Sequence, residues 1–194
     1  DLFDRQLTRI ETEFARLLER VKWVSLGGGI HFTGESYPVD DLAARLKAFS
    51  DRFGVQVYLE PGEAAITNST SLEVTVLDIL NNGKDLAVVD SSIEAHMLDL
   101  LIYREKAKLP QAGDHEYQIC GKSCLAGDIF GDARFERPLS VGDRISVADA
   151  AGYTMVKKNW FNGVNMPSIV MKDLDGSLRL VREFGYEDYA SSLS

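Results

Sequence analysis

The sequence predicts an α/β segment followed by an antiparallel β domain, and three observations favour that fold class. Helix and strand patterns alternate up to about residue 59, which is the order found in parallel α/β sheets. Beyond residue 64 the chain becomes a series of short β-rich runs separated by turn residues. Of the 194 residues, 45% are hydrophobic and 26% are charged, which is typical of a globular protein with a sizeable core.

The first 64 residues contain two predicted helices and two predicted strands. Apolar residues at helical spacing predict an amphipathic helix over residues 2–21. A short apolar run at 23–26 predicts a strand that ends in a glycine-rich loop. Pro38 begins a second amphipathic helix, Gly54 ends it, and residues 55–59 form the second strand. We therefore place a domain boundary near residue 64, which gives domains 1–64 and 65–194.

The second domain contains five predicted strands, at residues 71–80, 86–90, 116–120, 144–147 and 168–171. Turn residues such as Asn82-Gly83 and Val141-Gly142-Asp143 lie between them. A helix that includes His96 is expected after Asp90-Ser91-Ser92. Short strands separated by turns in this way indicate an antiparallel sheet.

Charge and cysteine content exclude several classes of protein. The net charge of −9 argues against a nucleic-acid partner, since phosphate binding needs clustered Lys and Arg. No apolar run approaches the roughly 20 residues of a membrane-spanning helix, and the amphipathic N-terminus is unlike a secretory signal. We therefore expect a cytoplasmic protein. The two cysteines, Cys120 and Cys124, exclude a disulfide scaffold and give little support to a metal site.

Three glycines, Gly27, Gly28 and Gly29, follow the first predicted strand. Such a loop can present consecutive backbone N–H groups to an anion, most often a phosphate, although a flexible turn is the alternative. Its spacing matches neither a dinucleotide fingerprint nor a nucleotide P-loop. Glu60 ends the second strand and should lie at the same edge of the sheet, where a carboxylate can keep a ring nitrogen protonated.

The stretch Gly121-Lys122-Ser123-Cys124 places a thiol in a loop rich in small residues. Cys124 is a candidate acid, base or nucleophile, and the alternative is a small buried hydrophobic side chain. His31, directly after the glycine loop, and Tyr153, beside a glycine, are further candidates for a site. Side chains of these two types are more often structural.

Taken together and in order, six stretches resemble one family. They are WVSLGGGIHFT, VYLEPGEA, VVDSSIEAHMLDLL, ICGKSCLAGDIFGD, DAAGYTMVKKNWFNG and EFGYEDY. The succession resembles the carboxynorspermidine decarboxylases, which belong to the pyridoxal-phosphate group that includes diaminopimelate and ornithine decarboxylases. The resemblance implies that residues 1–64 are the last strands and helices of an alanine-racemase-like (β/α) barrel. It also implies a homodimer whose active sites lie at the subunit interface.

The resemblance further implies pyridoxal 5'-phosphate as the cofactor and assigns roles to individual residues. Cys124 would enter from the partner subunit and return a proton to the substrate carbon, and Leu125 after it suits a polyamine-like substrate. Asp128 would contact the distal amine of the substrate. The cofactor would be held by Gly27, Gly28, Gly29 and Gly62 at its phosphate, by Tyr153 beside the phosphate and by Glu60 at the pyridine nitrogen. Further candidates for substrate contact are Glu63, Asp90 and His31.

The implied function is pyridoxal-phosphate-dependent decarboxylation of carboxynorspermidine, and of carboxyspermidine, in polyamine biosynthesis. Members of this family hold the cofactor on a lysine in an early barrel strand, and nothing ahead of Gly27 has that context, so we expect the C-terminal half of a longer enzyme. The alternatives are a non-catalytic binding or assembly module, and another decarboxylase, such as diaminopimelate decarboxylase, or a racemase of the same fold. The two polyamine substrates differ by one methylene, worth only about 1 kcal/mol, so the sequence does not separate them.

Overall fold

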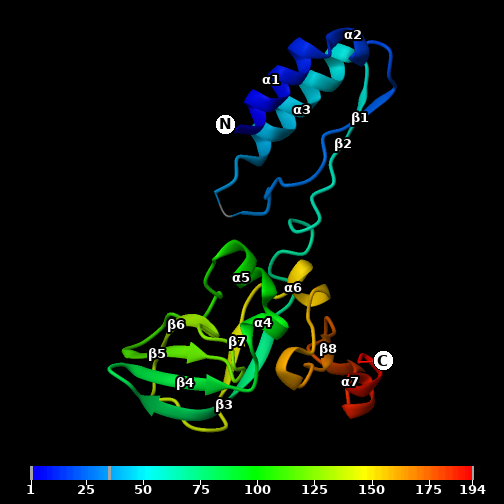
Figure 1. Cartoon of the computed structure of the whole chain (residues 1–194). Coiled ribbons are helices and arrows are strands. Elements are labelled where there is room, and N and C mark those ends of the chain that lie inside the picture. The colour runs from blue at the N-terminus through cyan, green and yellow to red at the C-terminus, as the bar shows by residue number, and fades with distance from the viewer. Residues whose placement is uncertain (1, 35, 194) are drawn as a thin grey trace. The chain divides into compact units, whose positions relative to one another are not determined.

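The structure is a computed structural model, and it describes residues 2–34 and 36–193. The chain divides into two compact units, one ending at Thr67 and the other beginning at Asn68. Figure 1 shows the helices and strands of each unit. Within the described ranges, no helix is long and apolar enough to cross a membrane.

The first unit packs helices against a short parallel sheet. Its helices are α1 (Leu2–Glu13), α2 (Ala15–Leu18) and α3 (Val39–Phe53), and its strands are β1 (Trp23–Ser25) and β2 (Gln56–Tyr58). The two strands are parallel, as the sequence predicted, with Ser25 opposite Tyr58. The single helix expected over 2–21 is interrupted at Phe14, whose φ of −117° and ψ of 14° are not helical. The apolar faces meet in a buried cluster of Leu7, Leu18, Phe49 and Val55.

A partly buried ionic contact also joins α1 to α3. Arg45 donates to Asp4 at 2.6 Å and, through two nitrogens, to both carboxylate oxygens of Glu11 at 3.0 and 2.7 Å. The Glu11 side chain is only 11% exposed, and that of Arg45 25%. Hydrogen bonds from the guanidinium to Glu11 and Asp4 raise the pKa of Arg45. The planar guanidinium of Arg45 therefore binds the Glu11 carboxylate through two hydrogen bonds, a geometry that arginine can form and lysine cannot.

The second unit is built on a sheet that, among the described residues, has five strands in the order β6-β5-β4-β3-β7. They are β3 (Leu72–Asn81), β4 (Asp85–Val89), β5 (His115–Cys120), β6 (Ile129–Phe135) and β7 (Arg144–Val147). Three of the pairings are antiparallel, as expected, but β4 and β5 are parallel. The chain between these two strands runs through α4 (Ile93–His96) and α5 (Leu98–Tyr103), a crossover and not a hairpin, and so brings β5 in parallel.

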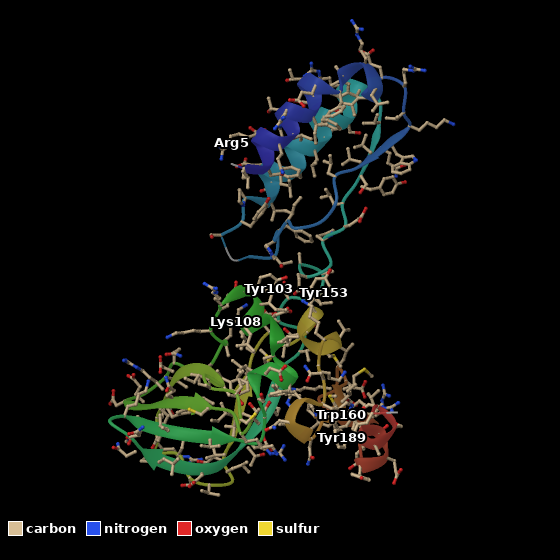
Figure 2. All side chains as sticks on the ribbon, in the orientation of Figure 1. Arg5, Tyr103, Lys108, Tyr153, Trp160 and Tyr189 are labelled. Carbon is tan, nitrogen blue, oxygen red and sulfur yellow. The ribbon has the colours of Figure 1, made fainter. Side chains whose placement is uncertain are left out.

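The rest of the second unit follows β7. It contains α6 (Tyr153–Val156), η1 (Phe161–Gly163), β8 (Ile169–Lys172), β9 (Leu178–Arg182) and α7 (Tyr186–Ser191). β8 and β9 form an antiparallel hairpin across a turn at residues 173–177. Trp160 then packs its ring against Phe184 and Tyr189, with ring centres 6.2 and 5.7 Å apart. Figure 2 shows Trp160 and Tyr189 together beside α7.

Candidate functional site

Gly27 and Glu60 lie side by side at the carboxyl ends of β1 and β2, the edge at which the sequence predicted them. Glu60 N donates to Gly27 O at 2.8 Å, and Leu26 N donates to Tyr58 O at 3.0 Å. A Cβ added at Gly28 would lie 2.6 Å from the Glu60 carbonyl oxygen. The two loops can approach this closely only because position 28 has no side chain.

Ser25 orients the Glu60 carboxylate, a contact that the sequence did not reveal. Its hydroxyl donates to Glu60 Oε1 at 2.5 Å and accepts from Gly27 N at 3.2 Å. Both Ser25 and Glu60 are exposed, so the carboxylate is fixed in direction yet open to a ligand. The only signal for Ser25 was its place at the end of the strand, directly ahead of Leu26 and the glycines.

Gly62 also lies close to Glu60, and two amides of the glycine loop have no partner in the described chain. Gly62 N donates to Glu60 O at 2.9 Å, and Gly62 itself is exposed. Within the described part of the chain, neither Gly28 N nor Gly29 N donates a hydrogen bond to another residue. Backbone donors of this kind are suited to an anionic ligand.

The segment that contains Cys124 is a tight loop folded around a buried carboxylate. Asp128 is 6% exposed, and its Oδ1 accepts from Ile93 N at 2.9 Å. Its Oδ2 accepts from Ser123 N at 3.1 Å and from Ser123 Oγ at 2.6 Å. A Cβ at Gly121 would overlap this carboxylate, so glycine is required there. The structure therefore gives Asp128 three partners in its own chain, and the expected contact with a substrate amine stays a prediction.

Cys124 is exposed, in contrast to the buried hydrophobic side chain that was the alternative expectation. Its amide N donates to Oδ1 of Asn162, 38 residues further along the chain, at 3.1 Å. Cys120, at the end of β5, is half-buried, and burial raises the pKa of its thiol. Of the two cysteines, Cys124 is the more exposed.

The short helix α4 packs beside the Cys124 loop and carries two buried polar groups. His96 is 4% exposed, and its Nδ1 shares a 2.8 Å hydrogen bond with Ser91 Oγ. Among the described residues, His96 Nε2 and Glu94 Oε2 are buried without a hydrogen-bond partner. Burial, with the charge of Lys122, lowers the pKa of His96 to about 4. Burial, with the charge of Asp128, raises the pKa of Glu94.

The remaining predicted substrate contacts lie in different surroundings. Asp90 Oδ1 accepts from Thr75 N at 2.8 Å, which commits part of this carboxylate to the sheet. Glu63 is half-buried in the first unit. His31 is exposed, and its carbonyl accepts from Gly34 N at 3.1 Å in a turn.

Tyr153 begins α6 and is 56% exposed. Lys157 Nζ lies 4.8 Å from the centre of its ring and 5.8 Å from that of Tyr103. The same ammonium pairs with Asp99 at 2.6 Å. Figure 2 shows Tyr103 and Tyr153 on neighbouring helices of the second unit. The pair of Lys157 and Asp99 therefore ties α6 to α5 next to the tyrosine expected at the phosphate.

The predicted residues thus form two groups, one in each unit: the glycine loop with Glu60, and Cys124 with Asp128. No group of three His, Cys, Asp or Glu side chains that could hold a metal ion occurs in residues 2–34 and 36–193. Side chains and amides of these types can bind an anion, pair with a cation and transfer a proton from a thiol.

Residues 23–151 match the family model of the pyridoxal-dependent decarboxylase C-terminal sheet domain. The chain is 64% identical over 193 residues to the carboxynorspermidine/carboxyspermidine decarboxylase of Herminiimonas arsenicoxydans, covering 99% of this chain and 53% of the relative. It is 40% identical over 197 residues to the carboxyaminopropylagmatine decarboxylase of Synechocystis, covering 98% of this chain and 51% of the relative. The chain spans about half the length of the curated relatives it matches.

A solved structure agrees with these matches. The crystal structure of carboxynorspermidine decarboxylase from Campylobacter jejuni, complexed with norspermidine, has a TM-score of 0.88 and 36% sequence identity, covering 97% of this chain and 57% of that chain. This likeness confirms the predicted fold, the end of an alanine-racemase-like barrel followed by a β domain. The chain therefore belongs to the pyridoxal-dependent decarboxylases, and residues 23–151 correspond to their C-terminal sheet domain.

Proposed function

We propose that this chain supplies part of an enzyme that decarboxylates carboxynorspermidine and carboxyspermidine in polyamine biosynthesis. The observation that carries the proposal is the 64% identity to a relative of that name, which extends over 99% of the chain and so includes both groups of site residues. The 40% identity to a carboxyaminopropylagmatine decarboxylase favours a second candidate substrate within the same reaction class.

The residues at the ends of β1 and β2 fit pyridoxal 5'-phosphate. The amides of Gly28 and Gly29 donate to no other residue within the described chain, as a phosphate site requires. Glu60 presents an exposed carboxylate held by Ser25, as a partner for the pyridine nitrogen requires. Gly62, hydrogen-bonded to Glu60, belongs to the same proposed set. Tyr153, exposed in the second unit, is a further proposed contact for the cofactor phosphate.

Each proposed residue has a defined task in the reaction. The cofactor, when bound, supplies an electron sink for the pair released as carbon dioxide leaves. Glu60 holds a proton on the ring nitrogen, which Ser25 favours by fixing the direction of the carboxylate. The thiol of Cys124 delivers a proton to the substrate carbon that has lost carbon dioxide. Asp128 folds the loop that carries this thiol.

Substrate recognition is proposed for three acidic side chains and one histidine, since the substrates carry several amines. Asp90, Glu63, Asp128 and His31 are the candidates. Asp128 has both oxygens engaged within the chain, so a substrate amine there shares the carboxylate with Ser123 and Ile93. We also propose a cytoplasmic homodimer in which Cys124 serves the cofactor of the neighbouring subunit.

The test is a product assay on the full-length protein that contains this sequence, supplied with pyridoxal 5'-phosphate. Carboxynorspermidine, carboxyspermidine, carboxyaminopropylagmatine and diaminopimelate are offered separately, and the product amines are measured by mass spectrometry. We expect the first two to give the highest kcat/KM. A preference for one of the others would reassign the substrate, and a holoenzyme that turns over none of the four would favour the non-catalytic module.

A further inference from the structure

The Cys124 loop has two supports, and both begin at main-chain atoms of α4 and the residues directly before it. In the first support, Ile93 N donates to Asp128 Oδ1 at 2.9 Å, and Lys122 N donates to Ser91 O at 3.0 Å. Asp128 then holds Ser123 through its other oxygen. This support fixes the loop on the side that precedes the thiol.

The second support comes from Asn159, in the segment between α6 and η1. Asn159 N donates to Ala95 O at 2.8 Å, and its Nδ2 donates to Glu94 O at 2.9 Å. Its Oδ1 accepts from Phe161 N at 2.8 Å. The side chain of Asn159 therefore links the first residue of η1 to the backbone of α4 by hydrogen bonds.

Asn162 carries this second support to the cysteine. Its Oδ1 accepts the hydrogen bond from Cys124 N at 3.1 Å. Its backbone is left-handed, with φ 59° and ψ 16°, a conformation that asparagine tolerates better than most residues. Trp160, two residues earlier, packs its ring against Tyr189 of α7, which gives this segment a further contact. From this turn, the side-chain oxygen of Asn162 lies within hydrogen-bond distance of the backbone N–H of Cys124.

We infer that Asn162 is a positioning residue for Cys124: by accepting its backbone N–H, Asn162 holds the thiol where its proton reaches the substrate carbon. This inference rests on the proposed function, in which Cys124 is the proton donor. A proton that is delivered to the cofactor carbon diverts the reaction. Water then hydrolyses the adduct to an aldehyde, and the amino group and the electron pair stay with the cofactor in its amine form. The ratio of aldehyde to amine therefore reports the placement of the proton.

The test compares two substitutions of Asn162 in the full-length holoenzyme. Asn162→Gly keeps the left-handed backbone and removes the acceptor, whereas Asn162→Asp keeps an acceptor at the same place. Asn68 also has a positive φ, of 58°, so Asn68→Gly is the matched control. Hydrogen–deuterium exchange at the Cys124 amide, resolved by fragmentation mass spectrometry, measures the contact, and the aldehyde-to-amine ratio measures its consequence.

We expect Asn162→Gly to speed exchange at the Cys124 amide about fivefold to tenfold, as loss of one hydrogen bond implies. The aldehyde fraction should rise by roughly tenfold, and Asn162→Asp should restore both quantities toward wild type. Asn68→Gly should change neither. Unchanged exchange in Asn162→Gly would overturn the inference, whatever the enzyme's substrate. Faster exchange with an unchanged ratio would overturn the link to the reaction, provided that Cys124→Ala does alter the ratio. An unaltered ratio in Cys124→Ala would overturn the proposed role of Cys124 and this inference with it.

Discussion

At the scale of single residues, the absence of a side chain at Gly28 allows the two loops of the proposed cofactor site to approach closely. A methyl group there would lie 2.6 Å from the Glu60 carbonyl oxygen, which belongs to the backbone and cannot turn aside. We expect Gly28→Ala to lower the free energy of unfolding by about 1–3 kcal/mol, as overpacked sites do. Urea titration of the chain measures the change.

Gly62 provides the matched control for Gly28. A Cβ at Gly62 would meet nothing within 4 Å. Gly62→Ala should therefore leave the free energy of unfolding within about 0.5 kcal/mol of wild type. Equal losses for the two substitutions would contradict the close approach at position 28.

His96 should make the stability of the second unit depend on pH. Burial keeps its pKa at about 4 in the folded state, below the ordinary value of 6.5. Between these values the unfolded chain binds a proton that the folded chain does not, so stability falls as pH falls from 6.5 toward 4. This group alone should account for a loss of about 3 kcal/mol, with the full stability present above pH 6.5.

Unfolding of a Trp23→Phe background isolates this effect, since Trp160 then reports the second unit by fluorescence. The free energy of unfolding is measured at several pH values between 7 and 4. His96→Gln should flatten the pH dependence, and His115→Gln, at the start of β5, should keep it. The same slope in His96→Gln as in the background would show that other groups cause the acid loss.

The sequence predicted contacts that follow from the order of the strands. It did not predict side-chain hydrogen bonds between residues far apart in the sequence. The edge shared by Gly27 and Glu60 was predictable because parallel strands place their carboxyl ends together. Ser25 was missed because a small polar residue at the end of a strand has no distinctive pattern. Asn162 was missed because its partner, Cys124, is 38 residues away. Asp128 was singled out for contact with the substrate amine, but its role in folding the Cys124 loop was not foreseen.

At the scale of elements, Arg45 holds α3 against α1. The guanidinium makes three charge-assisted hydrogen bonds of 2.6–3.0 Å, two of them to the nearly buried Glu11. Arg45→Met should lower the free energy of unfolding of the first unit by about 1.5–3 kcal/mol. Arg45→Lys should recover only part of this loss, because an ammonium cannot reproduce the fork.

Another residue of α3 supplies the control. Lys47 pairs with Asp51 at 2.8 Å, with side chains 75% and 63% exposed. Lys47→Met should change the free energy of unfolding by less than about 0.5 kcal/mol. Trp23 fluorescence in a Trp160→Phe background follows unfolding of the first unit. If Arg45→Met and Lys47→Met lowered the free energy of unfolding by similar amounts, Arg45 would not be what holds α3 against α1.

Among the elements, α3 and most strands were predicted, including the short β1, β2 and β7, whereas β6 and β9 were not. α3 was found because its apolar period extends over four turns and ends at Gly54. β6 was missed because Gly131 and charged residues interrupt its pattern. The parallel pairing of β4 and β5 follows from how the strands assemble in space, which no local pattern encodes.

At the scale of the whole molecule, the proposed homodimer predicts rescue between two impaired variants. Glu60→Ala should lower kcat by about a hundredfold or more, and Cys124→Ala should also lower turnover. If Cys124 serves the partner's cofactor, a mixed dimer has one site with both residues intact. Co-expression in equal amounts should then restore about a quarter of wild-type activity, since half of the dimers are mixed.

Two measurements complete that experiment. Sedimentation of the full-length protein should give twice the mass of one chain, and each variant expressed alone sets the baseline. Activity of the co-expressed pair that stays at the baseline would place Glu60 and Cys124 in a site made by a single chain. A monomeric protein that is fully active would remove the dimer from the proposal.

The supports of the Cys124 loop meet α4 and its approach at main-chain atoms: the carbonyls of Ser91, Glu94 and Ala95, and the amide of Ile93. Main-chain atoms are present whatever residue the gene encodes. A substitution along α4 therefore removes none of these four contact atoms, although Ile93, Ala95 and His96 are themselves buried. The same four atoms are therefore available to hold the loop in relatives of 64% and 40% identity, whose names give different substrates.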